Sequence, residues 1–186
     1  MDFAREAAEL LPYIQNHRRH IHQYPELSFR EKETTEYIQK ELESMGIEVI
    51  RFSDYYGLIG VLKGGRAGKT VLLRADIDAL GIREENELDF CSVHAGVMHA
   101  CGHDCHSAML LGAAKILSAY RDALKGTVKF LFQSAEESGH GANYYVDHGC
   151  LDGVDAAMAI HMMNEIPEGT FGIEAGPRMA SCTDFT

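Results

Sequence analysis

Apolar residues recur at steps of three and four along the first part of the chain, which is the spacing of one face of a helix. The first stripe consists of Phe3, Ala7, Leu10, Ile14, His17 and Ile21. Pro12 lies inside this stripe and has no amide hydrogen to donate. The pattern therefore predicts a helical segment up to Ile21 that breaks or kinks near Leu11.

A second helix is indicated by a start signal, a buried face and a stop signal. Ser28 and Glu31 have the spacing of a capping box, in which two side chains bind free backbone amides of the first turn. The buried face consists of Ile38, Leu42 and Met45. Gly46 suits the left-handed conformation that ends many helices. We therefore expect one helix to end at Gly46.

Short apolar runs typical of strands make up much of the remaining pattern. They lie at residues 47–52, 58–62, 71–74, 128–132 and 156–160. A glycine-rich link between 58–62 and 71–74 suggests a hairpin. Helical patterns at 108–117 and 143–147 fall between the later strands, and the runs 128–132 and 156–160 read as buried strands. The chain is thus expected to form an α/β fold, with an open, mixed, mostly parallel sheet and helices on both faces.

Length and charge narrow the class of protein. The chain has 186 residues and a mass of 20.6 kDa, which suits one domain. It carries 17 Lys and Arg against 28 Asp and Glu, a net charge of −11, and no basic run. We therefore expect neither a nucleic-acid partner nor an anionic membrane surface. No stretch approaches the ~18 apolar residues of a membrane helix.

The N-terminus and the cysteines bear on the compartment. The first residues mix charges and contain no apolar signal-peptide core. Five cysteines are an odd number, which fits reduced thiols better than a disulfide framework. We therefore expect a cytoplasmic protein, in which Cys91, Cys150 and Cys182 are inert.

Two glycine-containing segments look like nucleotide-binding motifs but do not satisfy them. Residues 63–70 end in Gly-Lys-Thr, but a strand follows where phosphate binding needs a helix N-terminus. Residues 139–141 lack the third glycine of a dinucleotide motif, because that position is Tyr144. Both segments are interpreted as turns.

Metal-type ligands cluster in the second half of the chain. Seven of the ten histidines lie between His94 and His161. Within this region Cys101 and His103 flank a glycine just before a predicted helix, so a thiolate and an imidazole can converge on a Zn, Mn or Ni type of cation. The negative charge of Asp104 could interact favourably with the helix dipole, or its carboxylate could orient a ligating imidazole.

A second arrangement of the same segment stays open, a closed structural zinc site. Its ligands would be Cys101, His103, Cys105 and His106. The histidines left as surface or packing residues are His17, His20, His22, His94, His140 and His148.

Two apolar strands lead directly into ionisable residues. The run 128–132 is followed by Glu136 and Glu137, and the run 156–160 by His161. Neighbouring side chains of an extended segment diverge, so one glutamate can bind a metal while the other faces a substrate. Because sites in open α/β sheets lie beyond the carboxyl ends of the strands, these residues suit metal-assisted hydrolysis.

Four motifs resemble those of the metal-dependent amidohydrolases within the larger dinuclear aminoacylase and carboxypeptidase family. They lie at residues 22–28, 74–80, 97–104 and 132–137. The family includes hippurate hydrolase, N-acyl-amino-acid deacylases and indole-acetyl-amino-acid hydrolase. The resemblance covers essentially the whole chain, and it implies a zinc-exopeptidase-like fold.

The resemblance also implies a ligand set. Two divalent ions, of Zn, Mn or Ni type, would be held by Cys101, His103, Glu137 and His161, with Cys101 bridging them. Glu136 would be the general base and acid. Asp76 and Asp78 fall where other branches of the family carry a His-x-Asp pair, which leaves their contact with metal open.

Family members are much longer than 186 residues. They carry an inserted lid and dimerisation domain after the segment that resembles residues 176–181, and the catalytic domain then resumes with a further histidine ligand. Residues 1–186 are therefore expected to be the N-terminal portion of a catalytic domain.

The leading hypothesis is hydrolysis of the amide bond of a small N-acyl amino acid or peptide-like conjugate. An alternative is a truncated metal-binding fragment without hydrolase activity, which would expose apolar sheet edges and associate; a homo-oligomer is left open. A third hypothesis, a nucleophilic Cys101, lacks a specified base and oxyanion hole.

Overall fold

The computed structural model describes residues 2–177 and 179. Its helices are α1 (Phe3–Glu9), α2 (Leu11–Gln23), α3 (Lys32–Ser44), α4 (His103–Ala119), the 3-10 turn η1 (Arg121–Ala123) and α5 (Gly141–Asp147). Its strands are β1 (Glu48–Arg51), β2 (Leu58–Lys63), β3 (Arg66–Asp76), β4 (Lys125–Gln133) and β5 (Ala156–Ala159). The expectations placed on Cys182 and on residues 178, 180 and 181 lie outside the described residues.

The five strands form one mixed sheet in the order β1-β2-β4-β3-β5. β1 with β2 and β2 with β4 are antiparallel, whereas β3 pairs in parallel with both β4 and β5. The expected α/β class with a mixed sheet is confirmed. The parallel strands β3, β4 and β5 are the ones that lead into the candidate ligands.

The predicted hairpin between β2 and β3 is wrong, because β4 lies between them. The amides from Gly64 to Arg66 donate to carbonyl groups of residues 121–126 instead. A side chain at Gly64 would place its Cβ 2.5 Å from the carbonyl oxygen of Leu124. The glycines therefore allow the close approach of the backbone that leads into β4. Because the amides of residues 64–66 already donate to carbonyl groups, they are not available to bind a phosphate.

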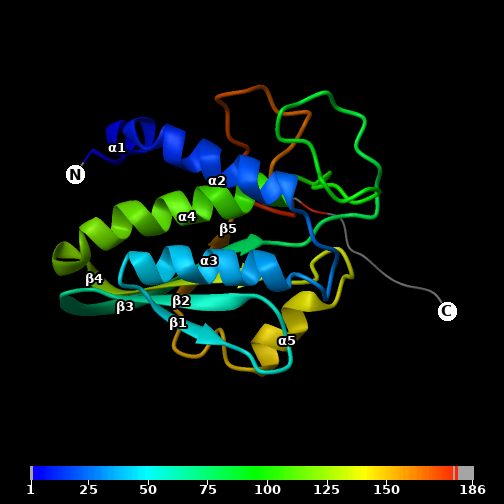
Figure 1. Cartoon of the computed structure of the whole chain (residues 1–186). Helices are drawn as coiled ribbons and strands as arrows, with labels where there is room; N and C mark the ends of the chain where they lie inside the picture. The colour runs from blue at the N-terminus through cyan, green and yellow to red at the C-terminus, as the bar shows by residue number, and fades with distance from the viewer. Residues whose placement is uncertain (1, 178, 180–186) are drawn as a thin grey trace.

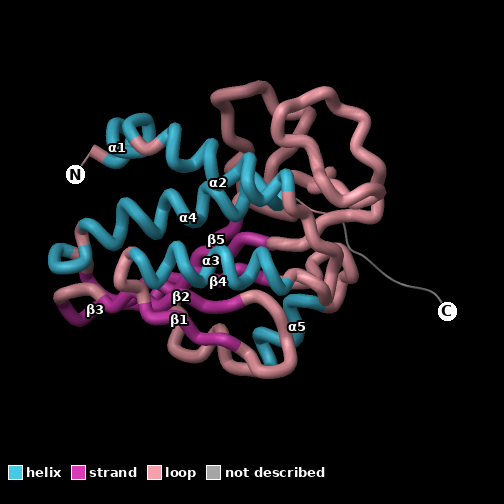
Figure 2. Tube along the Cα trace, in the orientation of Figure 1, coloured by secondary structure: helices cyan, strands magenta, loops and turns pink. Residues whose placement is uncertain are grey.

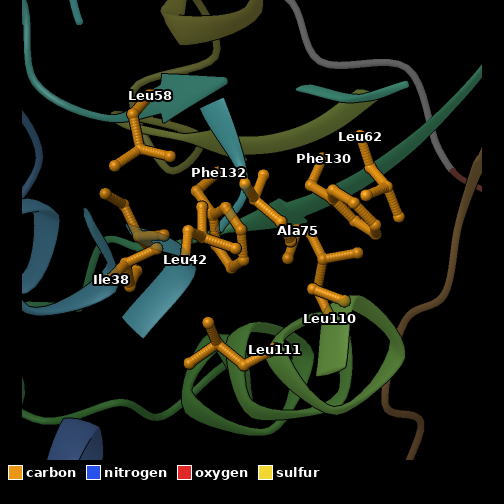
Figure 3. Packing of buried hydrophobic residues seen from close by; sticks show 12 residues of the cluster. Ile38, Leu42, Leu58, Leu62, Ala75, Leu110, Leu111, Phe130 and Phe132 are labelled. Atoms are coloured by element: carbon orange, nitrogen blue, oxygen red, sulfur yellow. The ribbon is translucent and has the colours of Figure 1, made fainter. Parts of the chain in front are cut away.

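Helices cover both faces of the sheet (Figures 1 and 2), as predicted. One face packs against α3 and α4, and α2 lies on the outer side of α4. Figure 3 shows this core, formed by Ile38, Leu42, Leu58, Leu62, Ala75, Leu110, Leu111, Phe130 and Phe132. The opposite face packs Ile59, Leu72 and Leu131 against Tyr145 of α5. Alternate residues of β2 and β4 thus serve the two faces.

The run 156–160 contains a strand as predicted, β5, but the prediction that this strand is buried is wrong. β5 lies at the edge of the sheet, pairs with β3 alone, and has four exposed residues. Met158 is 56% and Ile160 is 46% exposed, because no described helix covers this strand.

No described helix is long and apolar enough to cross a membrane.

Local helix signals were only partly reliable. The break near Leu11 is confirmed, since α1 ends at Glu9 and α2 starts at Leu11. Gly46, with φ of 68°, follows the end of α3 as expected. The capping box is wrong, because the carboxylate of Glu26 accepts the amide hydrogens of Glu33 and Thr34.

Candidate metal centre

The candidate ligands meet at one edge of the sheet. β3 ends at Asp76, β4 leads into Glu136 and Glu137, and β5 leads into His161. These three strands are parallel, so their carboxyl ends lie together. The segment before α4 brings Cys101 to the same edge, and α4 starts there with His103. Figure 2 shows long loops gathered at one end of the molecule, beyond the strands.

The structure brings all five predicted site residues together around the imidazole of His103. Ligand atoms of Cys101, His103 and His161 lie within 4.8 Å of one another, and so do those of His103, Glu136 and Glu137. The Cys101 Sγ and His161 Nε2 atoms are 3.5 Å apart. His103 Nε2 is 3.8 Å from both Glu136 Oε2 and Glu137 Oε1. His103 belongs to both groups, so all five residues form one continuous group of potential ligands.

Two buried atoms of this cluster have no hydrogen-bond partner among the described residues: His103 Nε2 and Glu137 Oε1. Burying polar atoms without partners is costly, so such atoms need an explanation. A divalent cation supplies one, because imidazole, carboxylate and thiolate are the ligand types of Zn and related metals. The residues present therefore fit a metal centre.

Asp78 holds two of the candidate ligands in place. His103 Nδ1 donates to the Asp78 carbonyl oxygen at 2.9 Å and lies 3.3 Å from Asp78 Oδ1. Asp78 Oδ2 accepts from Ser28 Oγ at 2.7 Å and from the Glu137 amide at 2.9 Å. This leaves the Nε2 atom of His103 directed at the carboxylates. Asp78 thus orients ligands, as carboxylates behind metal-bound imidazoles commonly do.

Charges around His103 alter its proton affinity. Burial lowers the pKa of His103, but the hydrogen bond with Asp78 and the charge of Asp76 outweigh it and raise the pKa. Burial and the proximity of Glu137 raise the pKa of the Cys101 thiol to about 12. Without a metal, a free thiolate at Cys101 is thus disfavoured, which argues against the cysteine-nucleophile hypothesis; a bound divalent cation would favour the thiolate instead.

Asp76 has protein partners for both carboxylate oxygens, although its buried Oδ2 makes an ion pair without a hydrogen bond to any described residue and lies 3.6 Å from His103 Nε2. Its Oδ1 accepts from His106 Nδ1 at 2.6 Å, and its Oδ2 lies 2.8 Å from Arg74 Nη1. His106 Nε2 accepts the amide hydrogen of Met162 at 2.9 Å. The pKa of Asp76 falls well below its usual range, because the hydrogen bond from His106 and neighbouring cations overcome burial. Asp76 and His106 therefore tie the segment that carries His161 to β3 and α4.

The closed structural zinc site is not supported. None of the three ligand groups found among residues 2–177 and 179 includes Cys105. The third group, Asp76 with His103 and His106, shares His103 with the other two.

Asp104 lies in the first turn of α4, as expected, but it does not orient a candidate ligand. Its Oδ2 accepts from Arg18 Nε and His22 Nδ1, each at 2.9 Å. His22 Nε2 also contacts Glu84 Oε1 at 3.0 Å. His22 is therefore a buried member of the network behind the site, and its hydrogen bonds with Asp104 and Glu84 raise its pKa. The sequence had predicted a surface or packing residue at this position.

Sequence reasoning also missed His106 and Glu31 as parts of the site's support. His106 lies three residues after His103 on the same face of α4, and that spacing was the available signal. Glu31 gave a misleading signal, because it matched a capping box.

The chain is similar to known proteins over most of its length. The model of the family described as Peptidase family M20/M25/M40 matches residues 72–183. The N-acetyl-L-cysteine deacetylase of Bacillus subtilis (strain 168) is 48% identical over 168 residues, covering 90% of this chain and 40% of that protein. The N-acyl-L-amino acid amidohydrolase of Geobacillus stearothermophilus is 46% identical over 169 residues, covering 90% of this chain and 46% of that protein.

A solved structure is similar to this chain in both fold and sequence. The Bacillus subtilis YXEP protein, described as a dinuclear metal binding peptidase from the M20 family, superposes with a TM-score of 0.86. It is 44% identical, and the match covers 89% of this chain and 47% of that one. The chain therefore spans less than half the length of each of these relatives.

Proposed function

Because the chain belongs to peptidase family M20/M25/M40, we propose that it carries the metal centre of a hydrolase that cleaves amide bonds of N-acyl amino acids or small peptide-like conjugates. The observation that carries this proposal is the cluster around His103, whose unpartnered Nε2 atom lies 3.8 Å from two carboxylates. The names of the deacetylase and amidohydrolase relatives supply the substrate class.

Cys101, His103, Glu137 and His161 would hold two divalent ions of Zn, Mn or Ni type, with Cys101 as the bridge. When bound, the ions would polarise the scissile carbonyl group and lower the pKa of a water molecule. Asp78 would orient His103 and Glu137, and the link from Asp76 through His106 to the Met162 amide would hold the segment that carries His161.

Glu136 is proposed as the general base and acid. Its side chain is 38% exposed, whereas that of Glu137 is 20% exposed, so Glu136 is the more accessible of the pair. Glu136 would take the proton of the attacking water and return it to the departing amine. Glu137, whose amide hydrogen Asp78 accepts and whose Oε1 atom is buried without a hydrogen-bond partner in the described part of the chain, is the proposed ligand of the pair.

A second candidate function is metal binding without hydrolysis by the 186-residue chain. It is favoured by two exposed apolar residues, Met158 in β5 and Ile160 directly after it. The purified chain, loaded with Mn or Zn and assayed against a panel of N-acetyl amino acids, separates the two candidates. Turnover supports the hydrolase, and bound metal without turnover supports the fragment.

The role of Glu136 is tested by Glu136→Gln in an active form of the protein. This variant should keep its metal and lose almost all turnover, because glutamine cannot accept the proton. Glu87→Gln, in the exposed loop before α4, is the matched control and should leave kcat unchanged. An unchanged kcat in Glu136→Gln would refute the assignment. Activity that survives EDTA would instead favour the nucleophilic Cys101.

A further inference from the structure

The turn that carries the two site glutamates contains an unusual backbone conformation. Ala135, directly before Glu136, has φ of 56°. Left-handed backbone of this kind is unfavourable for a residue with a Cβ atom, and it persists only where surrounding contacts hold it. The question is therefore which contacts hold Ala135.

Glu31 provides the contact at the centre of this turn. Its side chain is 0% exposed, and its Oε1 accepts the Ala135 amide hydrogen at 2.8 Å. On one side of Ala135, the Ser134 amide donates to the hydroxyl of Tyr145 at 2.9 Å. On the other side, the Ala135 carbonyl accepts from the Gly141 amide at 3.1 Å. Glu31 is the only charged group among these three contacts.

The start of α3 does not explain a fully buried carboxylate at position 31. The first amides of α3 are capped by Glu26, and Glu31 itself makes no side-chain cap hydrogen bond. Burial raises the pKa of Glu31, against the opposing effects of Ser134 and the Ala135 amide. Burying a carboxyl group is costly, so a role beyond the helix is needed to account for it.

We propose that Glu31 is a positioning residue, whose carboxyl group holds Ala135 in the left-handed conformation that directs Glu136 and Glu137 to separate tasks. If Ala135 relaxed to a right-handed conformation, the chain after β4 would turn in a new direction. Both glutamates would then change their positions, and Glu137 would move away from His103. The inference deepens the proposed function, on which it rests, by naming the group that sets the geometry of its base and ligand.

The test is a set of variants whose metal affinity is measured by competition with a chelator. Glu31→Met has a similar length but no acceptor, and it should weaken metal binding about tenfold or more, as loss of supporting groups at metal sites commonly does. Glu31→Gln keeps an acceptor for the Ala135 amide and should stay within about threefold of the unsubstituted chain. Glu33→Gln, which removes an exposed charge from the same helical turn, is the control and should have no effect.

Repeating the Glu31→Met substitution in a chain that also carries Ala135→Gly distinguishes a positioning role of Glu31 from a role in packing alone. Glycine adopts positive φ without strain, so in an Ala135→Gly background Glu31→Met should weaken metal binding by about threefold or less. An equal loss in both backgrounds, or no loss in either, would overturn the proposal.

Hydrogen exchange of the Ala135 amide, measured without metal, keeps the proposal testable if Glu31→Met fails to fold. The amide should exchange as slowly as those of β4 in the unsubstituted chain and in Glu31→Gln. Rapid exchange in the unsubstituted chain would overturn the proposal. A chain that binds no metal but protects this amide would instead contradict the proposed function alone.

Discussion

Acidification should release the stabilisation provided by Asp104, the carboxylate behind the metal centre. Asp104 is 1% exposed and accepts hydrogen bonds from Arg18 and His22. Burial alone would raise its pKa, but the hydrogen bond from His22 and neighbouring positive charges lower the pKa from 3.8 to about 2. At about 1.4 kcal/mol per pKa unit, this shift corresponds to about 2 kcal/mol of stability.

The sign follows from the direction of the shift. The folded state binds the Asp104 proton more weakly than the unfolded state, so the stabilisation is complete above the unfolded pKa and is lost as the pH falls towards the folded pKa. About 1 kcal/mol should be lost by pH 3, and about 2 kcal/mol by pH 2. Asp104→Asn cannot titrate. The difference in unfolding free energy between the unsubstituted chain and this variant should therefore shrink by these amounts on acidification.

The assay is urea unfolding followed by circular dichroism at pH 6, 4.5 and 3. EDTA is present throughout, because bound metal would add its own pH-dependent stabilisation. Asp147→Asn, an exposed aspartate of α5, is the matched control and should run parallel to the unsubstituted chain. If the difference between the unsubstituted chain and Asp104→Asn stays constant between pH 6 and pH 3, the reasoning about this network is refuted.

Three further predictions concern the site and its support. Asp78→Ala should weaken metal binding about 10- to 100-fold in a chelator competition, because no side-chain oxygen is left to accept from Ser28, the Glu137 amide and His103; an unchanged affinity would contradict its orienting role. Gly57→Ala should lower the unfolding free energy by about 3 kcal/mol or more in urea, because its φ is 76° and a Cβ would lie 2.1 Å from the Tyr145 hydroxyl. Cys105→Ala should leave the metal content, measured by elemental analysis, unchanged; loss of one equivalent would revive the structural zinc site.

Three of the five candidate site residues, Glu136, Glu137 and His161, were predictable because they follow apolar strands, whereas Cys101 lies just before α4 and His103 at its start. Two strands were predicted from the apolar runs at 128–132 and 156–160 alone. Parallel strands bring their carboxyl ends to one edge of a sheet. That argument placed Glu137 and His161 near Cys101 without any knowledge of distances. It worked although the burial assigned to 156–160 was wrong, because strand direction does not depend on how much of the strand is covered.

The strand order could not be predicted from local signals. The glycines between β2 and β3 suggested a tight hairpin, because nothing nearby in sequence indicates that a distant strand enters between them. A glycine is needed at position 64 for a different reason: the backbone at Leu124 lies too close to leave room for a Cβ atom. Only the tertiary pairing of β4 with both neighbours distinguishes these two explanations.

The support behind the ligands was also beyond local reasoning. Ser28 and Glu31 fit a capping box, but each finds a stronger partner elsewhere in the fold: Ser28 donates to Asp78, and Glu31 accepts from Ala135. Tertiary hydrogen bonds override local helix signals in this way when a closer capping group is present, as Glu26 is here. Buried polar networks of this kind depend on several elements at once, so no single stretch of sequence reveals them.

The central claim is that Cys101, His103, Glu137 and His161 form a centre for two divalent ions. Elemental analysis of the purified chain after equilibration with Zn or Mn, combined with its intact mass, tests this claim most directly. We predict two equivalents of metal in the unsubstituted chain and at most one in Cys101→Ala. A chain that retains no metal, or a Cys101→Ala variant that still retains two equivalents, would contradict the account.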